Sequence, residues 1–253
     1  MKRLLSFLLA FILLPVPFAA ARGEKEPEIF TSGDFQYALL EDGTAEIRRY
    51  TGKTENLTIP DTLDGHPVTS IGYRAFYSCE SLKNITLPDS VTAIGDYAFN
   101  DCSSLTSITI PDSVAAIGDF AFSGCTSLAC LTLPDSVTSI GEGAFYWCTS
   151  LISITIPDSV TSIGHYAFSG STSLASLALP DSVTSIGDGA FADCTSLSSL
   201  TLPNSVTSIG TDAFSGCSRL RTITVSRGSY AAQYCKENCL PYTYPDSLDW
   251  LNN

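Results

Sequence analysis

A unit of 23 residues repeats along most of this chain, and it constrains the fold more than any other feature of the sequence. A Leu-Pro or Ile-Pro pair marks each copy, and after a first interval of 28 residues the step is always 23 residues. The prolines of these pairs are Pro60, Pro88, Pro111, Pro134, Pro157, Pro180 and Pro203. A fixed period of this length indicates a solenoid, because one unit cannot bury its apolar face without neighbouring units.

One unit has the pattern L-x-x-I-T-L-P-D-S-V-T-x-I-G-x-x-A-F-x-x-C-x-S. The segments I-T-L and V-T-x-I alternate apolar and polar residues, which predicts two short half-buried strands in each coil. Proline ends the first strand because it offers no N–H to a sheet, and Asp-Ser forms the turn that follows. The glycine after the second strand is expected to permit a turn with positive φ. Ala-Phe is then expected to pack a short helical or 3₁₀ turn on the core.

The repeat resembles the BspA-type, or Treponema pallidum-type, leucine-rich repeats of bacterial secreted and surface proteins, and the resemblance covers residues 57–226 in register. It implies an α/β solenoid, a right-handed curved array of 23-residue units whose L-x-x-I-x-L strands form a parallel sheet on the concave face. The flanks are similar to the family's ends, which implies an N-terminal β-hairpin cap and a C-terminal helical cap. Proteins of this family attach bacteria to host or neighbouring-cell proteins, so the resemblance implies binding.

The sequence predicts four segments. Residues 1–21 have the features of a signal peptide, with Lys2 and Arg3 before an apolar run and a small-residue cleavage site near Ala21. An uncleaved membrane anchor is the alternative, but two prolines leave the apolar run too short to span a bilayer. Residues 22–56 would form the N-terminal cap, residues 57–226 the repeats and residues 227–253 the C-terminal cap. We therefore expect a secreted, extracellular or cell-envelope protein without a membrane span in its mature chain.

The two caps have local signals of their own. Residues 34–50 predict a hairpin, whose turn lies at residues 41–43. Residues 228–238 predict a capping helix, for which Ser229 is the N-cap. Such caps are needed because the ends of a solenoid would otherwise expose its core.

Nine cysteines in a secreted chain suggest disulfides, yet six of them occupy one repeat column, which indicates core positions. The six are Cys79, Cys102, Cys125, Cys148, Cys194 and Cys217. Disulfides between neighbouring coils are the alternative, because in-register Cα atoms would be close enough to bridge. Cys235 and Cys239 share one face of the expected helix, and a strained disulfide between them is left open. Cys130 lies in an outward polar column, either as a free reactive thiol or as a drift from serine.

The net charge of −13 is distributed unevenly, because residues 84–217 contain no Lys or Arg. A surface of one sign repels phosphate backbones and anionic lipid, so we expect no nucleic-acid partner. Catalysis needs unlike groups at one point, and the two histidines lie apart: His66 in the lengthened first turn, His165 in a column expected to be solvated. The Asp residues that follow the repeat prolines are explained better by turn formation than by a calcium ladder. We therefore expect no enzyme activity, metal or cofactor.

The concave columns are the natural binding surface of a curved solenoid. One of them is a row of threonines interrupted by Ala178, and the column beside it is apolar at its centre, with Lys83 and Arg221 at its ends. An apolar centre with a polar rim is typical of a modest interface. A bland Ser/Thr surface that binds nothing strongly is the alternative. The candidate residues here are Ala129, Cys130, Thr132, Ile152, Thr155 and Ala175.

A second candidate patch arises where aromatic residues depart from the repeat. A tryptophan stands in a column of otherwise small or polar residues, and other rings share nearby columns on the convex edge. Trp and Tyr are the residues that most often anchor interfaces. The alternative is that these rings merely cover neighbouring coils. The candidate residues are Tyr97, Phe120, Tyr146, Trp147 and Tyr166.

These observations predict a monomeric secreted or cell-surface binding or adhesion protein. Its partner would be a protein, such as a host extracellular-matrix or cell-envelope protein. Ice or crystal-surface binding by the threonine column is the alternative, which the curvature and Ala178 disfavour. A β-solenoid enzyme acting on polysaccharide is a third hypothesis. It requires acids clustered at a groove, whereas the acids here stand one per coil in turns.

Overall fold

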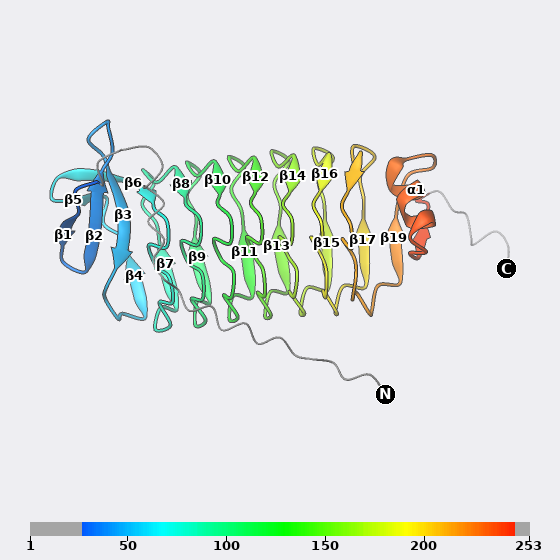
Figure 1. The fold of residues 1–253 in the computed structure, drawn as a ribbon, viewed down its shortest axis with the longest axis horizontal. Helices are drawn as coiled ribbons and strands as arrows, with labels where there is room; N and C mark the ends of the chain where they lie inside the picture. Colours follow the sequence, from blue (N-terminus) through cyan, green and yellow to red (C-terminus); the bar gives the residue numbers. More distant parts are fainter. Residues whose placement is uncertain (1–26, 246–253) are drawn as a thin grey trace.

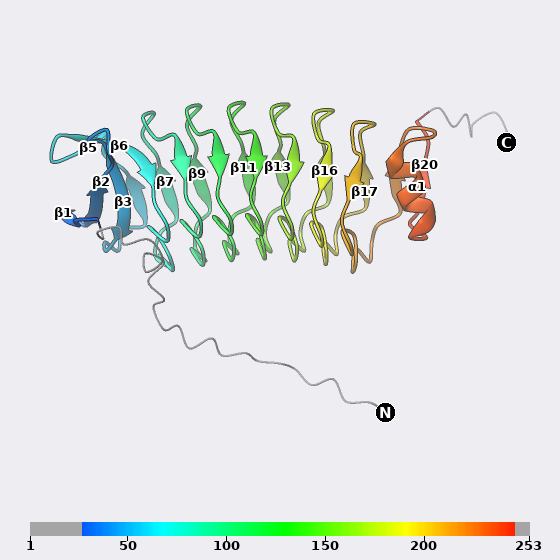
Figure 2. The ribbon, with the colours of Figure 1, turned by 45° about the horizontal axis from the view of Figure 1, so that its top comes forward.

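The structure, a computed structural model, describes residues 27–245. The chain forms a row of stacked coils, with extra strands at the N-terminal end and a helix at the other end (Figures 1 and 2). The prediction of a leucine-rich-repeat solenoid is confirmed, since neighbouring strands pair in parallel between residues 23 positions apart, as in Cys130 with Ser153. The predicted signal peptide and its cleavage site near Ala21 lie outside the described residues.

The I-T-L segments form the first set of strands, and we call the surface that carries their exposed side chains the strand face. In most of these strands the middle residue is buried and its two neighbours are exposed, as the two-residue period of a strand requires. The strands are β4 (Asn56–Thr58), β7 (Asn84–Thr86), β9 (Ser107–Thr109), β11 (Cys130–Thr132), β13 (Ser153–Thr155), β15 (Ser176–Ala178), β17 (Ser199–Thr201) and β19 (Thr222–Thr224).

The V-T-x-I segments form a second set of parallel strands, which belongs to one continuous 11-stranded sheet. Its strands in the coils are β6 (His66–Ile71), β8 (Ala93–Ile94), β10 (Ala116–Ile117), β12 (Ser139–Ile140), β14 (Ser162–Ile163), β16 (Ser185–Ile186) and β18 (Ser208–Ile209). The lengthened first turn is itself a hairpin, because β5 (Thr62–Leu63) pairs antiparallel with β6. Asp64 and Gly65 turn the chain there with φ values of +49° and +89°.

The glycine after each second strand is required for a reason other than the one predicted. A Cβ atom on Gly118 would lie 2.6 Å from the carbonyl carbon of Gly95, and one on Gly164 would lie 2.5 Å from the carbonyl oxygen of Gly141. The coils therefore approach so closely that only glycine fits, whereas positive φ occurs two residues later, for example at Tyr97. The predicted helical or 3₁₀ turn at Ala-Phe is not formed, since residues 96–101 are turns and a left-handed residue such as Tyr97 cannot continue a right-handed helix.

A column of phenylalanine rings runs through the core from one end of the repeats to the other. Neighbouring rings stack with centroids 5.0–5.6 Å apart. Tyr50 of the N-terminal cap and Tyr234 of the C-terminal helix continue the column, at 5.4 and 6.3 Å from the first and last ring. Both caps thus cover the core with an aromatic ring. The column consists of Phe76, Phe99, Phe122, Phe145, Phe168, Phe191 and Phe214.

The predicted core role of the cysteine column is confirmed. Four of its thiols are fully buried, whereas Cys79 and Cys217 at the two ends are half-buried. The Cys125 thiol donates a hydrogen bond to the carbonyl oxygen of Phe99 in the preceding coil, at 3.2 Å. Ser171, which replaces cysteine in this column, donates in the same way to Phe145. All nine cysteines are free, so neither the disulfides between coils nor the Cys235–Cys239 bond is formed.

The hairpin and helix predicted for the caps are confirmed. β2 (Phe35–Leu39) and β3 (Ala45–Tyr50) pair antiparallel, and β1 (Phe30–Ser32) adds a third strand that the sequence did not predict. The helix α1 (Tyr230–Glu237) has Ser229 as its N-cap, whose hydroxyl accepts a hydrogen bond from the Ala232 N–H at 3.1 Å. After it, β20 (Tyr242–Thr243) pairs with β19 and closes the strand face.

Candidate functional site

The strand face carries the first predicted patch. Five of its six residues are exposed and Ala129 is half-buried. Ile152 is the most prominent apolar member, with 55% of its surface exposed. Its N–H donates to the Ala129 carbonyl oxygen at 2.8 Å, so these two residues lie side by side. Cys130 accepts a hydrogen bond from the Ser153 hydroxyl at 3.5 Å, which makes it an exposed thiol among polar neighbours.

The sheet beneath this patch is interrupted. β11 and β13 form a separate two-stranded sheet, because their hydrogen-bonded ladder does not continue to β9 on one side or to β15 on the other. A groove of about 360 Å³ follows the first interruption and is lined by residues of β9 and β11, among them Cys130 and Thr132. The predicted patch therefore borders this groove through Cys130 and Thr132 and lies where the ladder of the strand face is interrupted.

The second predicted patch lies on the turns that follow the 11-stranded sheet. Tyr97, Phe120 and Tyr166 occupy one repeat column, and all three have φ between +53° and +57°. Trp147 stands in a second column of left-handed residues, with φ +56°. Non-glycine residues rarely adopt this conformation. Here it lays each side chain against the next coil.

The aromatic rings lie against glycine residues of the next coil. A Cβ atom on Gly170 would lie 2.7 Å from Cδ1 of Trp147, and one on Gly189 would lie 2.5 Å from Cε1 of Tyr166. Phe120 covers Gly143 in the same way. The predicted alternative, that the rings cover neighbouring coils, therefore describes part of their contacts. Trp147 and Tyr166 nevertheless keep 55% and 45% of their surface exposed.

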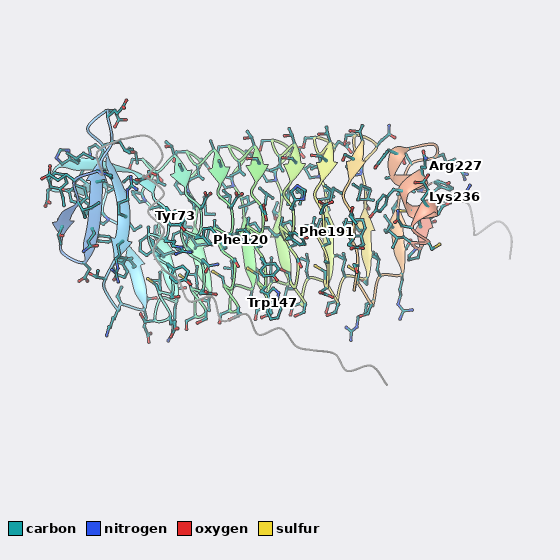
Figure 3. All side chains as sticks on the ribbon, viewed as in Figure 1. Tyr73, Phe120, Trp147, Phe191, Arg227 and Lys236 are labelled. Atoms are coloured by element: carbon teal, nitrogen blue, oxygen red, sulfur yellow. The ribbon has the colours of Figure 1, made fainter. Side chains whose placement is uncertain are left out.

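Four of the five predicted aromatic residues form one chain of ring contacts. The centroids are 5.1 Å apart for Tyr97 and Phe120, 6.4 Å for Phe120 and Tyr146, and 6.2 Å for Tyr146 and Trp147. Figure 3 shows Tyr73, Phe120 and Trp147 following one another along the row of coils. Tyr166 is set apart by Gly143, which occupies the intervening place in its column. We call Tyr73, Tyr97, Phe120, Tyr146 and Trp147 the aromatic strip.

Sequence reasoning missed the N-terminal end of this strip. Tyr73 contacts Tyr97 with centroids 5.8 Å apart, and the Arg74 guanidinium lies 5.3 Å from the Tyr97 ring centroid. Arg74 precedes Tyr97 in the same repeat column, and this shared column could have indicated from the sequence that Arg74 lies next to the Tyr97 ring. Burial raises the pKa of Tyr97 and Tyr73 adds to the rise, while Arg74 opposes it. The Tyr97 hydroxyl is thus protonated at neutral pH.

The column of His165 is structural rather than simply solvated. The Asp119 side chain accepts a hydrogen bond from the Glu142 N–H at 2.7 Å, and the His165 ring nitrogen Nδ1 accepts one from the Asp188 N–H at 2.9 Å. These side chains satisfy backbone groups of the next coil. Within residues 27–245, no group of three or more His, Cys, Asp or Glu is arranged to hold a metal ion. No helix in that part of the chain is long and apolar enough to cross a membrane.

Known proteins resemble this chain closely in sequence and fold. The family model of the BspA type leucine rich repeat region matches residues 49–151 and 138–244 in six copies. A leucine-rich repeat protein of T. pallidum is 36% identical with a TM-score of 0.71, over 86% of this chain and 98% of that one. One from Bacteroides ovatus is 29% identical with a TM-score of 0.55, over 85% of this chain and 67% of that one. No curated protein sequence matches the chain.

Proposed function

Since this chain belongs to the BspA-type leucine-rich repeat family, we propose that it is a secreted or cell-surface protein that binds another protein through its solenoid. The observation that carries this proposal is the aromatic strip, a connected row of rings on the surface of an otherwise small and polar repeat. Its partner would be a protein of the host extracellular matrix or of a cell envelope. The binding protein itself would act as a monomer.

Trp147 is the strongest anchor that this surface offers. More than half of the indole is exposed, and its other side is held against Gly170, so it presents a rigid apolar face. Burying the exposed part in a partner would contribute roughly 1–2 kcal/mol. Tyr146 supports the indole at 6.2 Å, and Tyr residues add a hydroxyl that can bond across an interface. A rigid anchor loses little conformational entropy on binding, which favours affinity.

The patch around Ile152 supplies a second part of the same proposal. Ile152 is exposed beside Ala129, and the groove along β11 gives a partner side chain a place to enter. Trp147 precedes Ile152 by a short turn, so one partner that wraps this turn could contact both. The acidic surface disfavours nucleic acid and anionic lipid and favours a neutral or basic protein surface.

The regularity of the strand face bears on the alternative of ice binding. Such binding requires a flat, evenly spaced array of hydroxyl groups, and here Ala178 and the two interruptions of the ladder divide the threonine column. This observation favours protein binding. The polysaccharide-enzyme hypothesis has less support, because Asp119 and His165 are engaged by backbone N–H groups of the next coil.

The experiment measures binding of the mature chain to immobilised extracellular-matrix and envelope proteins by surface plasmon resonance. Trp147→Ser and Tyr146→Ser should each weaken binding at least tenfold. Both install a residue that other coils carry in the same columns, Ser78 and Ser169, so the fold should persist. Tyr230→Ser is the control, because Tyr230 is a comparably exposed ring at the far end of the molecule.

Equal affinity of all three variants would remove the aromatic strip from the proposal. If Ile152→Thr then lowered the affinity, the strand face would carry the binding. If no protein of the panel bound above the level of a chain in which both patches were replaced, the adhesion hypothesis would fail.

A further inference from the structure

A cleft of about 700 Å³ lies between the N-terminal cap and the first coil. Residues 48–53, from the end of β3 and the loop after it, line one side, and most of residues 74–81 line the other. Its size falls within the range of small-molecule sites in proteins. The cleft adjoins the aromatic strip at Arg74, but no residue of either patch lines it, so its role does not depend on the proposed function.

The cleft concentrates positive charge on an acidic protein. Arg48, Arg49, Lys53 and Arg74 line it together with one carboxylate, Glu80, whereas residues 84–217 contain no Lys or Arg. Arg48 is ion-paired with Glu46. Among the residues that the structure describes, the other three cations have no carboxylate within salt-bridge distance. The residues that line the cleft thus carry a net positive charge, in contrast to the repeats of residues 84–217.

Arg74 is held in place without being neutralised. Its guanidinium lies 5.1 Å from the ring centroid of Tyr73 and 5.0 Å from that of Tyr77. The rings fix the orientation of the guanidinium through their π faces and leave its charge in place. Its Nε atom is buried and has no hydrogen-bond acceptor within the described residues. A guanidinium makes its strongest hydrogen bonds with anionic oxygens, because these bonds are charge-assisted.

We propose that this cleft binds a compact ligand that carries a multiply charged oxyanion, such as a phosphate, sulfate or polycarboxylate group. Arg49, Lys53 and Arg74 supply its charge-assisted hydrogen bonds, and Tyr77 covers its less polar side. The ligand is compact because a long polyanion would run onto the acidic repeats and be repelled there. The planar fork of Arg74 favours an oxyanion with two free oxygens on one side.

Isothermal titration calorimetry at low ionic strength tests this proposal on the full mature chain. Inorganic pyrophosphate, a trisulfated disaccharide and citrate serve as probes, and the tightest of them identifies the source of the oxyanion. Arg49→Gln and Arg74→Gln should each weaken that probe at least tenfold. Arg221→Gln removes the same charge from an exposed position on the last coil and should change the affinity less than twofold. Arg49 is exposed, so its variant remains informative even if Arg74→Gln fails to fold.

Cys79 provides a second readout, because it lines the cleft whereas Cys130 lies on the strand face. A bound probe should slow alkylation of Cys79 several-fold and leave Cys130 unchanged. The proposal is overturned if none of the three probes binds the wild-type chain. It is also overturned if Arg221→Gln weakens binding as much as Arg49→Gln does, or if the probe slows alkylation of both thiols equally.

Discussion

Gly170 offers a sharp test of how the exposed tryptophan is seated. Gly170 follows Trp147 one coil later, has φ +74° and lies under the indole. In the repeat column of Trp147, a residue with a larger side chain is followed one coil later by glycine: Gly124 follows Asp101, and Gly216 follows Asp193. Ser78, which has a small side chain, is the only non-glycine residue of this column that is followed one coil later by another non-glycine residue, Asp101. We therefore predict that Gly170→Ala is destabilising in two separable ways.

The first contribution is conformational, because an alanine at this φ costs about 1–2 kcal/mol in any background. The second is steric, since the new Cβ would lie 2.7 Å from Cδ1 and 2.9 Å from Nε1 of Trp147. The new Cβ would push the half-exposed indole off Gly170 toward solvent, so this contribution is limited to the packing that the indole loses, about 1 kcal/mol. Gly170→Ala should therefore lower the free energy of unfolding by about 2–3 kcal/mol in the wild-type chain and by about 1–2 kcal/mol in a Trp147→Ser background.

Urea unfolding followed by circular dichroism measures the four proteins of this double-mutant cycle, with equal m-values as the condition for comparing them. A coupling free energy near 1 kcal/mol between the two sites supports a direct contact between the Trp147 indole and Gly170. An identical cost in both backgrounds would refute the contact between Trp147 and Gly170. No cost in either background would refute the argument from φ.

Three further predictions concern the core. At pH 8 a thiol reagent should label the exposed Cys130 and Cys239 of the native protein first. Burial raises the pKa of Cys148 to about 12, so almost no thiolate is present there. Early labelling of Cys148, detected by mass spectrometry, would contradict this prediction. Phe145→Ala should lower the free energy of unfolding in urea by about 3–5 kcal/mol, since two rings of the column lose their stacking partner. Phe145→Leu should lower it by less than half as much. Ser171→Cys should raise the stability by up to about 1 kcal/mol, because a thiol suits this apolar column better and keeps the hydrogen bond to Phe145; a loss of stability would be unexpected.

The sequence predicted those features that each unit encodes by itself. Strand alternation, the buried cysteine column and the cap at Ser229 follow from local pattern, and the structure confirms them. The role of Gly118 was misjudged, because the close approach of Gly95 belongs to the stacking of two coils and not to one unit. The same limit explains why the hydrogen bond from Glu142 to Asp119 was missed.

The candidate sites follow the same division. The exposure of Ile152 and Trp147 could be predicted, because each departs from its repeat column. The basic cleft could not, because residues 48–53 and 74–81 are brought together only by the parallel pairing of β3 with β6, which joins the cap to the first coil. Their charges also appear unremarkable when they are read one by one along the chain.

The serine of each Asp-Ser turn links its coil to the coil before it: the Ser136 hydroxyl donates to the Val114 carbonyl oxygen at 2.5 Å, and Ser159 donates to Val137 likewise. Every coil is therefore fastened to its neighbour by short bonds that lie along the direction of stacking. Under a pulling force such an array should give way one coil at a time, starting from a loosened end. Each released coil of 23 residues would lengthen the chain by about 75 Å, so the molecule would extend in steps and absorb a sudden load.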